Sequence, residues 1–98
     1  MLIYVSHEWQ GKDENFQKAK KIVHDLQIKD LDNCYICPLT TFQYFNYCEL
    51  AYTSEMDLRF DLLSACDKLL VVCDYIDEDV NAEIEFAELV GMEVDYLD

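Results

Sequence analysis

Glu83 is the residue whose type and surroundings most clearly indicate chemistry. Phe86, Ala87 and Val90 follow it at spacings of three, four and seven residues, which places Glu83 on the apolar face of a helix. A carboxylate there is costly unless it is paired or borders a cavity, and the helix N-terminus helps to keep it ionised. Such a carboxylate can attack an anomeric carbon and form a glycosyl ester. The alternative is a half-exposed glutamate in the first turn, whose negative charge interacts favourably with the positive end of the helix dipole.

Other candidate functional residues also allow both a functional and a structural interpretation. His7 can serve as a general base or lie on the surface as a polar residue. Trp9 and the aromatic-rich stretch 39–53 can stack on a nucleobase, or they can pack a core or a dimer interface. The sequence has no zinc-ligand spacing and no glycine-rich phosphate loop, so we expect neither a metal nor an organic cofactor.

The composition narrows the range of partners. Twenty-one acidic residues against seven basic ones give a net charge of −14, which argues against nucleic acid and anionic membranes. The charge indicates solubility or, alternatively, an acidic surface that occupies a basic protein partner. Five cysteines, an odd number, occur without a recognisable export signal, so we expect free thiols and a cytoplasmic location. The CxxC spacing of Cys34 and Cys37 falls in a predicted strand, where the two side chains point to opposite faces.

Alternating elements are expected to position these residues in a single domain, 1–98. We predict strands over 2–6, 34–37, 68–73 and 92–97, and helices over 13–27, from Ser54 onward and over about 80–90. Ser54 with Asp57 is typical of a capping box, and Asp79 is the predicted cap of the last helix. This order implies a three-layer α/β sandwich with a parallel sheet of four or five strands. Ligands should bind beyond the carboxyl ends of the strands, near segments 7–12, 39–53 and 74–79.

Several segments resemble the nucleoside 2-deoxyribosyltransferase-like family, in order along nearly the whole chain. The run from Glu83 to Val94, EIEFAELVGMEV, is similar to the signature around that family's nucleophile. LIYVS at 2–6 resembles its opening strand, CYICPL at 34–39 its second strand, and LSACDKLLVV at 63–72 the segment that ends in Cys-Asp and leads into a buried strand.

The resemblance implies a flavodoxin-like fold, N-glycosidic chemistry and a homodimer. Glu83 matches the nucleophile and Tyr4 the tyrosine of the sugar site. A family aspartate on the middle helix corresponds to Asp57 or Asp61, and Asp77 lies where some members keep an aspartate. We expect deoxyribosyl transfer or hydrolysis of a nucleoside or a nucleotide-derived molecule.

The chain departs from the family pattern at two places. His7 and Glu8 replace a Gly-Pro turn, and the acidic loop 77–79 replaces a glycine-containing one. Ser6, Lys12 and Arg59 are the available phosphate-binding candidates, so an uncharged nucleoside is favoured over a nucleotide. The departures favour an alternative function, in which the same pocket binds a nucleotide-derived ligand without turnover. A further alternative is an acidic inhibitor from a phage or other mobile element that acts through protein–protein contact.

Overall fold

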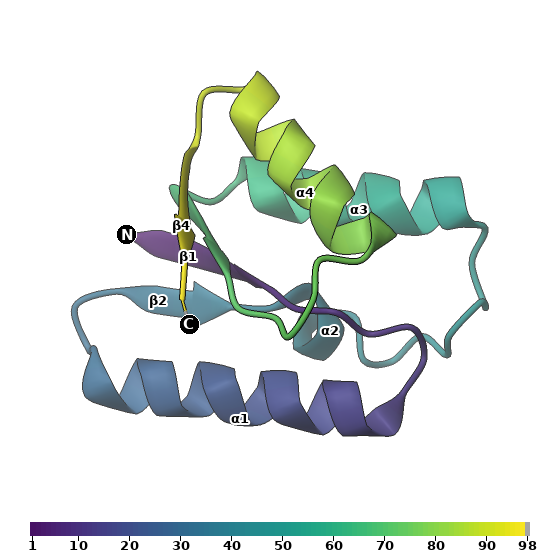
Figure 1. The fold of residues 1–98 in the computed structure, drawn as a ribbon, viewed down its shortest axis with the longest axis horizontal. Coiled ribbons are helices and arrows are strands. Elements are labelled where there is room, and N and C mark those ends of the chain that lie inside the picture. The colour runs from purple at the N-terminus through teal and green to yellow at the C-terminus, as the bar shows by residue number, and fades with distance from the viewer. Residues whose placement is uncertain (98) are drawn as a thin grey trace.

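The computed structural model describes residues 1–97 and contains four strands and four helices (Figure 1). In chain order they are β1 (Leu2–Ser6), α1 (Asp13–Lys29), β2 (Cys34–Ile36), α2 (Pro38–Thr41), α3 (Tyr52–Ser64), β3 (Lys68–Val71), α4 (Glu78–Leu89) and β4 (Glu93–Tyr96). The predicted α/β alternation is confirmed. The short helix α2 was not predicted.

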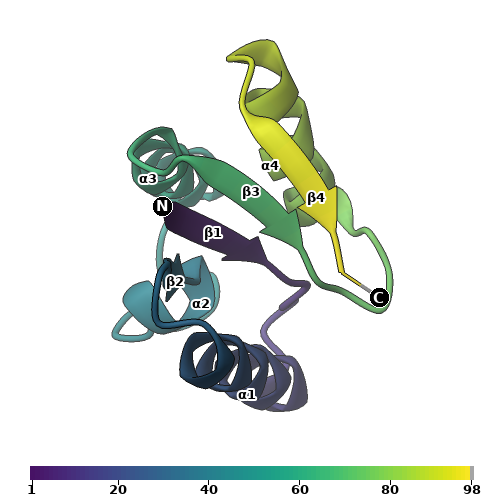
Figure 2. The same ribbon diagram turned by 90° about the vertical axis from the view of Figure 1, so that its left-hand side faces the viewer.

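All four strands are parallel and lie in the order β2-β1-β3-β4. Helix α1 covers one face of the sheet, and α3 and α4 cover the other, which makes three layers (Figure 2). This arrangement is compatible with a flavodoxin-like sandwich, in which the strand order reverses beside the first strand. Since β1 lies between β2 and β3, the segment after its carboxyl end is central to the edge where ligands are expected.

Alternation along β1 supplies both halves of the core. Tyr4 points into the cluster beneath α3 and α4, where it meets Leu63 and Leu69. Val5 points to the opposite face and packs with Ala19 of α1. A five-residue strand with both faces buried reads as a continuous apolar run, because neither face meets water.

The starts of two helices differ from the predictions. Helix α3 begins at Tyr52 with Ala51 at the N-cap and no side-chain cap, so the predicted Ser54–Asp57 capping box is wrong. Helix α4 is capped by Asp77, whose carboxylate accepts a hydrogen bond from the Val80 amide at 2.8 Å. The predicted cap, Asp79, lies inside the first turn of the helix, one residue after its start at Glu78. The extended backbone of Asp77 aims its side chain at the free amides instead.

The five cysteines are free thiols, with Cys37 buried and Cys34 exposed. In the described part of the chain, no helix has the length and apolar character needed to cross a membrane.

Candidate functional site

Helix α4 presents Glu83 to the inside of the fold. Val80, Glu83, Ile84 and Ala87 form its buried stripe, with the spacing of one helix face. Glu83 therefore lies on an apolar face, as predicted, although Val90 at the end of the helix is 54% exposed. The Glu83 side chain itself is fully buried. A carboxylate in such a place needs polar partners, because an unpaired charge in the core costs several kcal/mol, on the order of a whole fold's stability.

Two hydroxyl groups of β1 supply partners to Glu83. Tyr4 donates a hydrogen bond from its Oη to Oε2 of Glu83, and Ser6 donates from its Oγ to Oε1 at 2.8 Å. Tyr4 and Ser6 point to the same face because they are two residues apart in a strand. Arg59 of α3 places its Nη1 3.9 Å from Glu83 Oε1. Three separate elements thus converge on one carboxyl group.

The surroundings of Glu83 act on its pKa in opposite directions. Burial raises the pKa most, while the positive charge of Arg59 and the hydroxyl groups of Tyr4 and Ser6 lower it, and Asp79 adds a small increase. Burial prevails and raises the pKa of Glu83 to about 7. The carboxyl group is therefore only partly ionised near neutrality, in contrast to the charged group expected from the sequence. Burial first, and then Glu83, raise the pKa of Tyr4 well above its usual value, so Tyr4 remains a donor.

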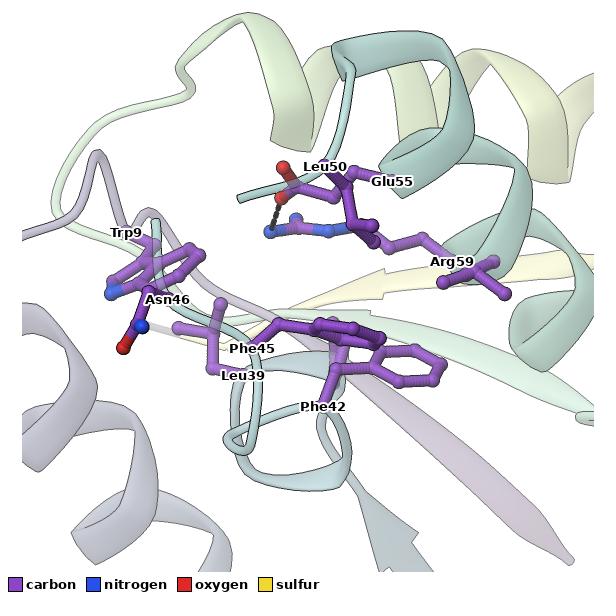
Figure 3. A pocket seen from close by; sticks show the side chains of 10 residues that line it. Trp9, Leu39, Phe42, Phe45, Asn46, Leu50, Glu55 and Arg59 are labelled. Carbon is purple, nitrogen blue, oxygen red and sulfur yellow. Dashed lines mark hydrogen bonds and ion pairs between the residues drawn. The ribbon is translucent and has the colours of Figure 1, made fainter. Parts of the chain in front are cut away.

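Arg59 connects this cluster to a pocket. The pocket is lined by aromatic and aliphatic side chains and by the pair Arg59 and Glu55, whose Nη2 and Oε1 atoms are 2.9 Å apart. Figure 3 shows the guanidinium of Arg59, joined to Glu55, across the pocket from the rings of Phe42 and Phe45, with Trp9 at one end. Glu83 does not line the pocket, since Arg59 lies between them.

The pocket is small. Its volume is about 30 Å³, enough for one or two water molecules, whereas pockets for small ligands measure roughly 300–1,000 Å³. Segment 42–50 contributes side chains to its lining and to that of a more open hollow of about 410 Å³. Leu50 and Glu55 line both spaces, so the two are adjacent.

Two further predicted residues lie near this pocket. Trp9 lines it, and its ring meets that of Tyr47 edge to face at a centroid distance of 5.2 Å. Asp77 lines the outer hollow together with Tyr52 and Asp79, but its carboxylate is engaged as the cap of α4.

His7 and Asp57 are not brought to the Glu83 cluster. His7 is buried on the α1 side of the sheet, where its Nδ1 lies 2.7 Å from the carbonyl oxygen of Glu8 and its ring borders a trough with Lys18. Asp57 lies on the exposed face of α3 and lines no described pocket. Helical spacing explains this, because α3 turns Arg59 inward and Asp57 and Asp61 outward.

Sequence reasoning missed the importance of Glu55 and underrated Arg59. Their spacing of four residues on one helix, with the glutamate first, is the signal that predicts an ion pair. Glu8 was also missed: it is 1% exposed, and its carboxylate accepts from the backbone amide of Asp74 at 3.2 Å, which ties the loops after β1 and β3 together. Within residues 1–97, no group of three or more potential ligands is arranged to hold a metal ion.

Comparisons with known proteins identify no relative. No protein-family model matches the chain, and neither a curated protein nor a solved structure is significantly similar to it.

Proposed function

We propose that this chain acts on the N-glycosidic bond of a nucleoside, with Glu83 as the nucleophile. The observation that carries the proposal is the fully buried Glu83 carboxyl group, held by Tyr4 and Ser6 at the carboxyl edge of a parallel sheet. That edge is where parallel α/β folds bind ligands. The resemblance of segment 83–94 to the nucleophile signature of nucleoside 2-deoxyribosyltransferases supports the same assignment.

The chemistry has two displacement steps. An oxygen of ionised Glu83 forms a bond to the anomeric carbon while the carbon–nitrogen bond breaks, and the departing base takes up the bonding electrons and a proton from solvent water. Water or a second base then attacks the same carbon, gives up a proton to solvent, and releases Glu83 as the carboxylate. Tyr4 and Ser6 keep the carboxyl group in position for both steps. Trp9, Phe42 and Phe45 provide aromatic faces for the base, and Glu55, rather than Asp57, is the α3 carboxyl group next to it.

This function requires the pocket to open, because Arg59 separates it from Glu83 and its volume is too small for a nucleoside. We expect a ligand to displace segment 42–50 and the Arg59 side chain together. The free thiols fit the reducing cytoplasm that we propose as its location.

The test is release of free base. The purified chain is incubated with a panel of ribonucleosides and 2′-deoxynucleosides, and the products are separated by chromatography. We expect base release by the wild type and none by Glu83→Gln. Glu88→Gln is the matched control, because it makes the same change on the exposed face of the same helix and should retain activity. Equal release by Glu83→Gln and the wild type would refute the nucleophile assignment.

A second function, binding without turnover, is favoured by one observation: Glu83 is fully buried and contributes nothing to the pocket lining. In that case the aromatic pocket would bind a nucleoside while Glu83 remained structural. Thermal unfolding separates the two functions, since a ligand at 100 times its Kd adds about 2.7 kcal/mol of stability. Stabilisation by nucleosides without base release would support the binder.

A further inference from the structure

The one arginine of the chain is shared between two carboxylates. Arg59 is 3% exposed and extends inward from the middle of α3. Its Nη2 lies 2.9 Å from Glu55 Oε1, and its Nη1 lies 3.9 Å from Glu83 Oε1. The first distance is a hydrogen-bonded ion pair, whereas the second is a charge contact without a hydrogen bond. Arg59 therefore interacts more closely with Glu55, although Glu83 is the more deeply buried carboxylate.

The two carboxylates differ in what else can stabilise them. The Glu55 side chain is 22% exposed, so water can solvate its charge if Arg59 moves away. Glu83 is fully enclosed, and besides Arg59 it has only the neutral hydroxyl groups of Tyr4 and Ser6. A buried carboxylate depends strongly on a nearby positive charge, because the low-dielectric interior offers nothing else to balance it. A small movement of one guanidinium therefore matters much more to Glu83 than to Glu55.

We propose that Arg59 is a positioning residue that sets the ionisation of Glu83, and that Glu55 competes with Glu83 for it. The inference rests on the proposed function, in which Glu83 must be ionised to act as a nucleophile. Glu55 and Arg59 both line the pocket, so a ligand that replaces Glu55 as the neighbour of Arg59, or that moves it, changes the charge of Glu83. Occupation of the pocket and activation of the carboxyl group are then linked.

The other charged and titratable groups that face Glu83 do not offer such a link. Tyr4 from β1 and Cys37 from the end of β2 are fully buried neutral groups, and burial raises the pKa of both. Asp79, in the first turn of α4, contributes a small opposing charge. Among the groups facing Glu83, Arg59 alone carries a positive charge.

The experiment measures the titration of the Glu83 carboxyl carbon by NMR on ¹³C-glutamate-labelled protein, with the signal assigned by its loss in Glu83→Gln. In Arg59→Met we expect the midpoint to rise by about 1 pH unit or more, because the compensating charge is removed. In Glu55→Gln we expect it to fall, because Arg59 is then free to approach Glu83. Asp61→Asn, on the exposed face of the same helix, is the control and should leave the midpoint in place.

Combining the substitutions tests the sharing itself. In the Arg59→Met background, Glu55→Gln should have a much smaller effect on the midpoint than in the wild type. An equal effect in both backgrounds would show that Glu55 simply repels Glu83 and would overturn the proposal, as would unchanged midpoints in both single variants. If Arg59→Met does not fold, Arg59→Gln takes its place: glutamine keeps a polar side chain without the charge, so Glu55→Gln should again have a much smaller effect on the Glu83 midpoint than in the wild type.

This titration uses no substrate, so its outcome is separate from that of the activity assay. Base release combined with a midpoint that ignores Arg59 would keep the proposed function and eliminate this inference. Opposite movements of the midpoint in the two single variants, without base release from any nucleoside, would keep the assignment of Arg59 and eliminate the glycosidic function.

Discussion

Replacing Glu83 with glutamine should change how the stability of the fold depends on pH. Burial raises the pKa of Glu83 to about 7, against an ordinary value of 4.5 that applies to the unfolded chain. Between these values the native state binds more protons than the unfolded state, so the free energy of unfolding decreases as the pH rises. Glutamine cannot ionise, and the variant should escape this decrease.

The magnitude follows from the difference between the two pKa values. A difference of about 2.5, at about 1.4 kcal/mol for each pH unit, corresponds to about 3 kcal/mol in total. Most of it, about 2–3 kcal/mol, falls between pH 5 and pH 8, a range that avoids the isoelectric point near 4.1. The advantage of the variant over the wild type should grow by that amount, a large share of a typical domain stability of roughly 5–15 kcal/mol.

Urea unfolding at pH 5, 6, 7 and 8 measures this change, followed by circular dichroism and by the fluorescence of Trp9, the one tryptophan. Only the difference between variant and wild type is interpreted, because the other carboxylates then cancel. Glu88→Gln, on the exposed face of α4, should show a difference that does not vary with pH. If the difference for Glu83→Gln stays constant, or falls with pH, then Arg59 and the hydroxyl groups outweigh burial and the reasoning is refuted.

Two further substitutions test the parts of the structure that surround the site. Gly11→Ala should lower the free energy of unfolding by more than about 1–2 kcal/mol, because its φ is +71° and an added Cβ atom would lie 2.4 Å from the Tyr47 ring. Gly91→Ala is the control: its φ is +76°, but nothing lies within 4 Å, so only the cost of the backbone conformation should appear. Equal losses for the two variants in urea unfolding would contradict the Tyr47 contact. Asp77→Ala should lower the free energy of unfolding by about 1 kcal/mol through loss of the α4 cap, and Asp79→Ala should lower it much less. A larger loss for Asp79→Ala in the same assay would show that Asp79 is the cap, as predicted from the sequence.

The fold was largely predictable because its strands and helices differ in apolar period. The opening run at 2–6 is a strand buried from Ile3 onward, as its composition indicates. The continuous run at 68–73 contains the shorter strand β3, in which Leu69 and Val71 are buried and Lys68 and Leu70 are half-buried. The residues between Leu39 and Tyr52 were not predictable in detail. They are dense in aromatics, and an aromatic side chain can cover a pocket, fill a core or lie exposed without any change in local spacing.

The candidate site was predictable only where one element determines it. Glu83 follows from the helical period of α4. Tyr4 was expected from the resemblance and Ser6 as a phosphate-binding candidate, and the alternation of β1 explains why both point to the same face. Asp57, with Asp61 as the alternative, was expected at the site because the resemblance implies an aspartate on the middle helix, but α3 turns both side chains outward. The meeting of Arg59 with Glu83 depends on how α3 and α4 pack together, and no pattern within a single element contains that information.

The central position of β1 has a consequence for how the chain reaches its native state. Leu2–Ser6 is synthesised before β3, yet its pairing with Lys68–Val71 joins residues that are more than 60 positions apart. Such distant parallel pairings slow folding, because a long loop must close before any contact repays the lost entropy. On the ribosome, this hydrophobic strand lacks its β3 neighbour until residues 68–71 have emerged. Until then it is a segment that chaperones can bind and other nascent chains can capture.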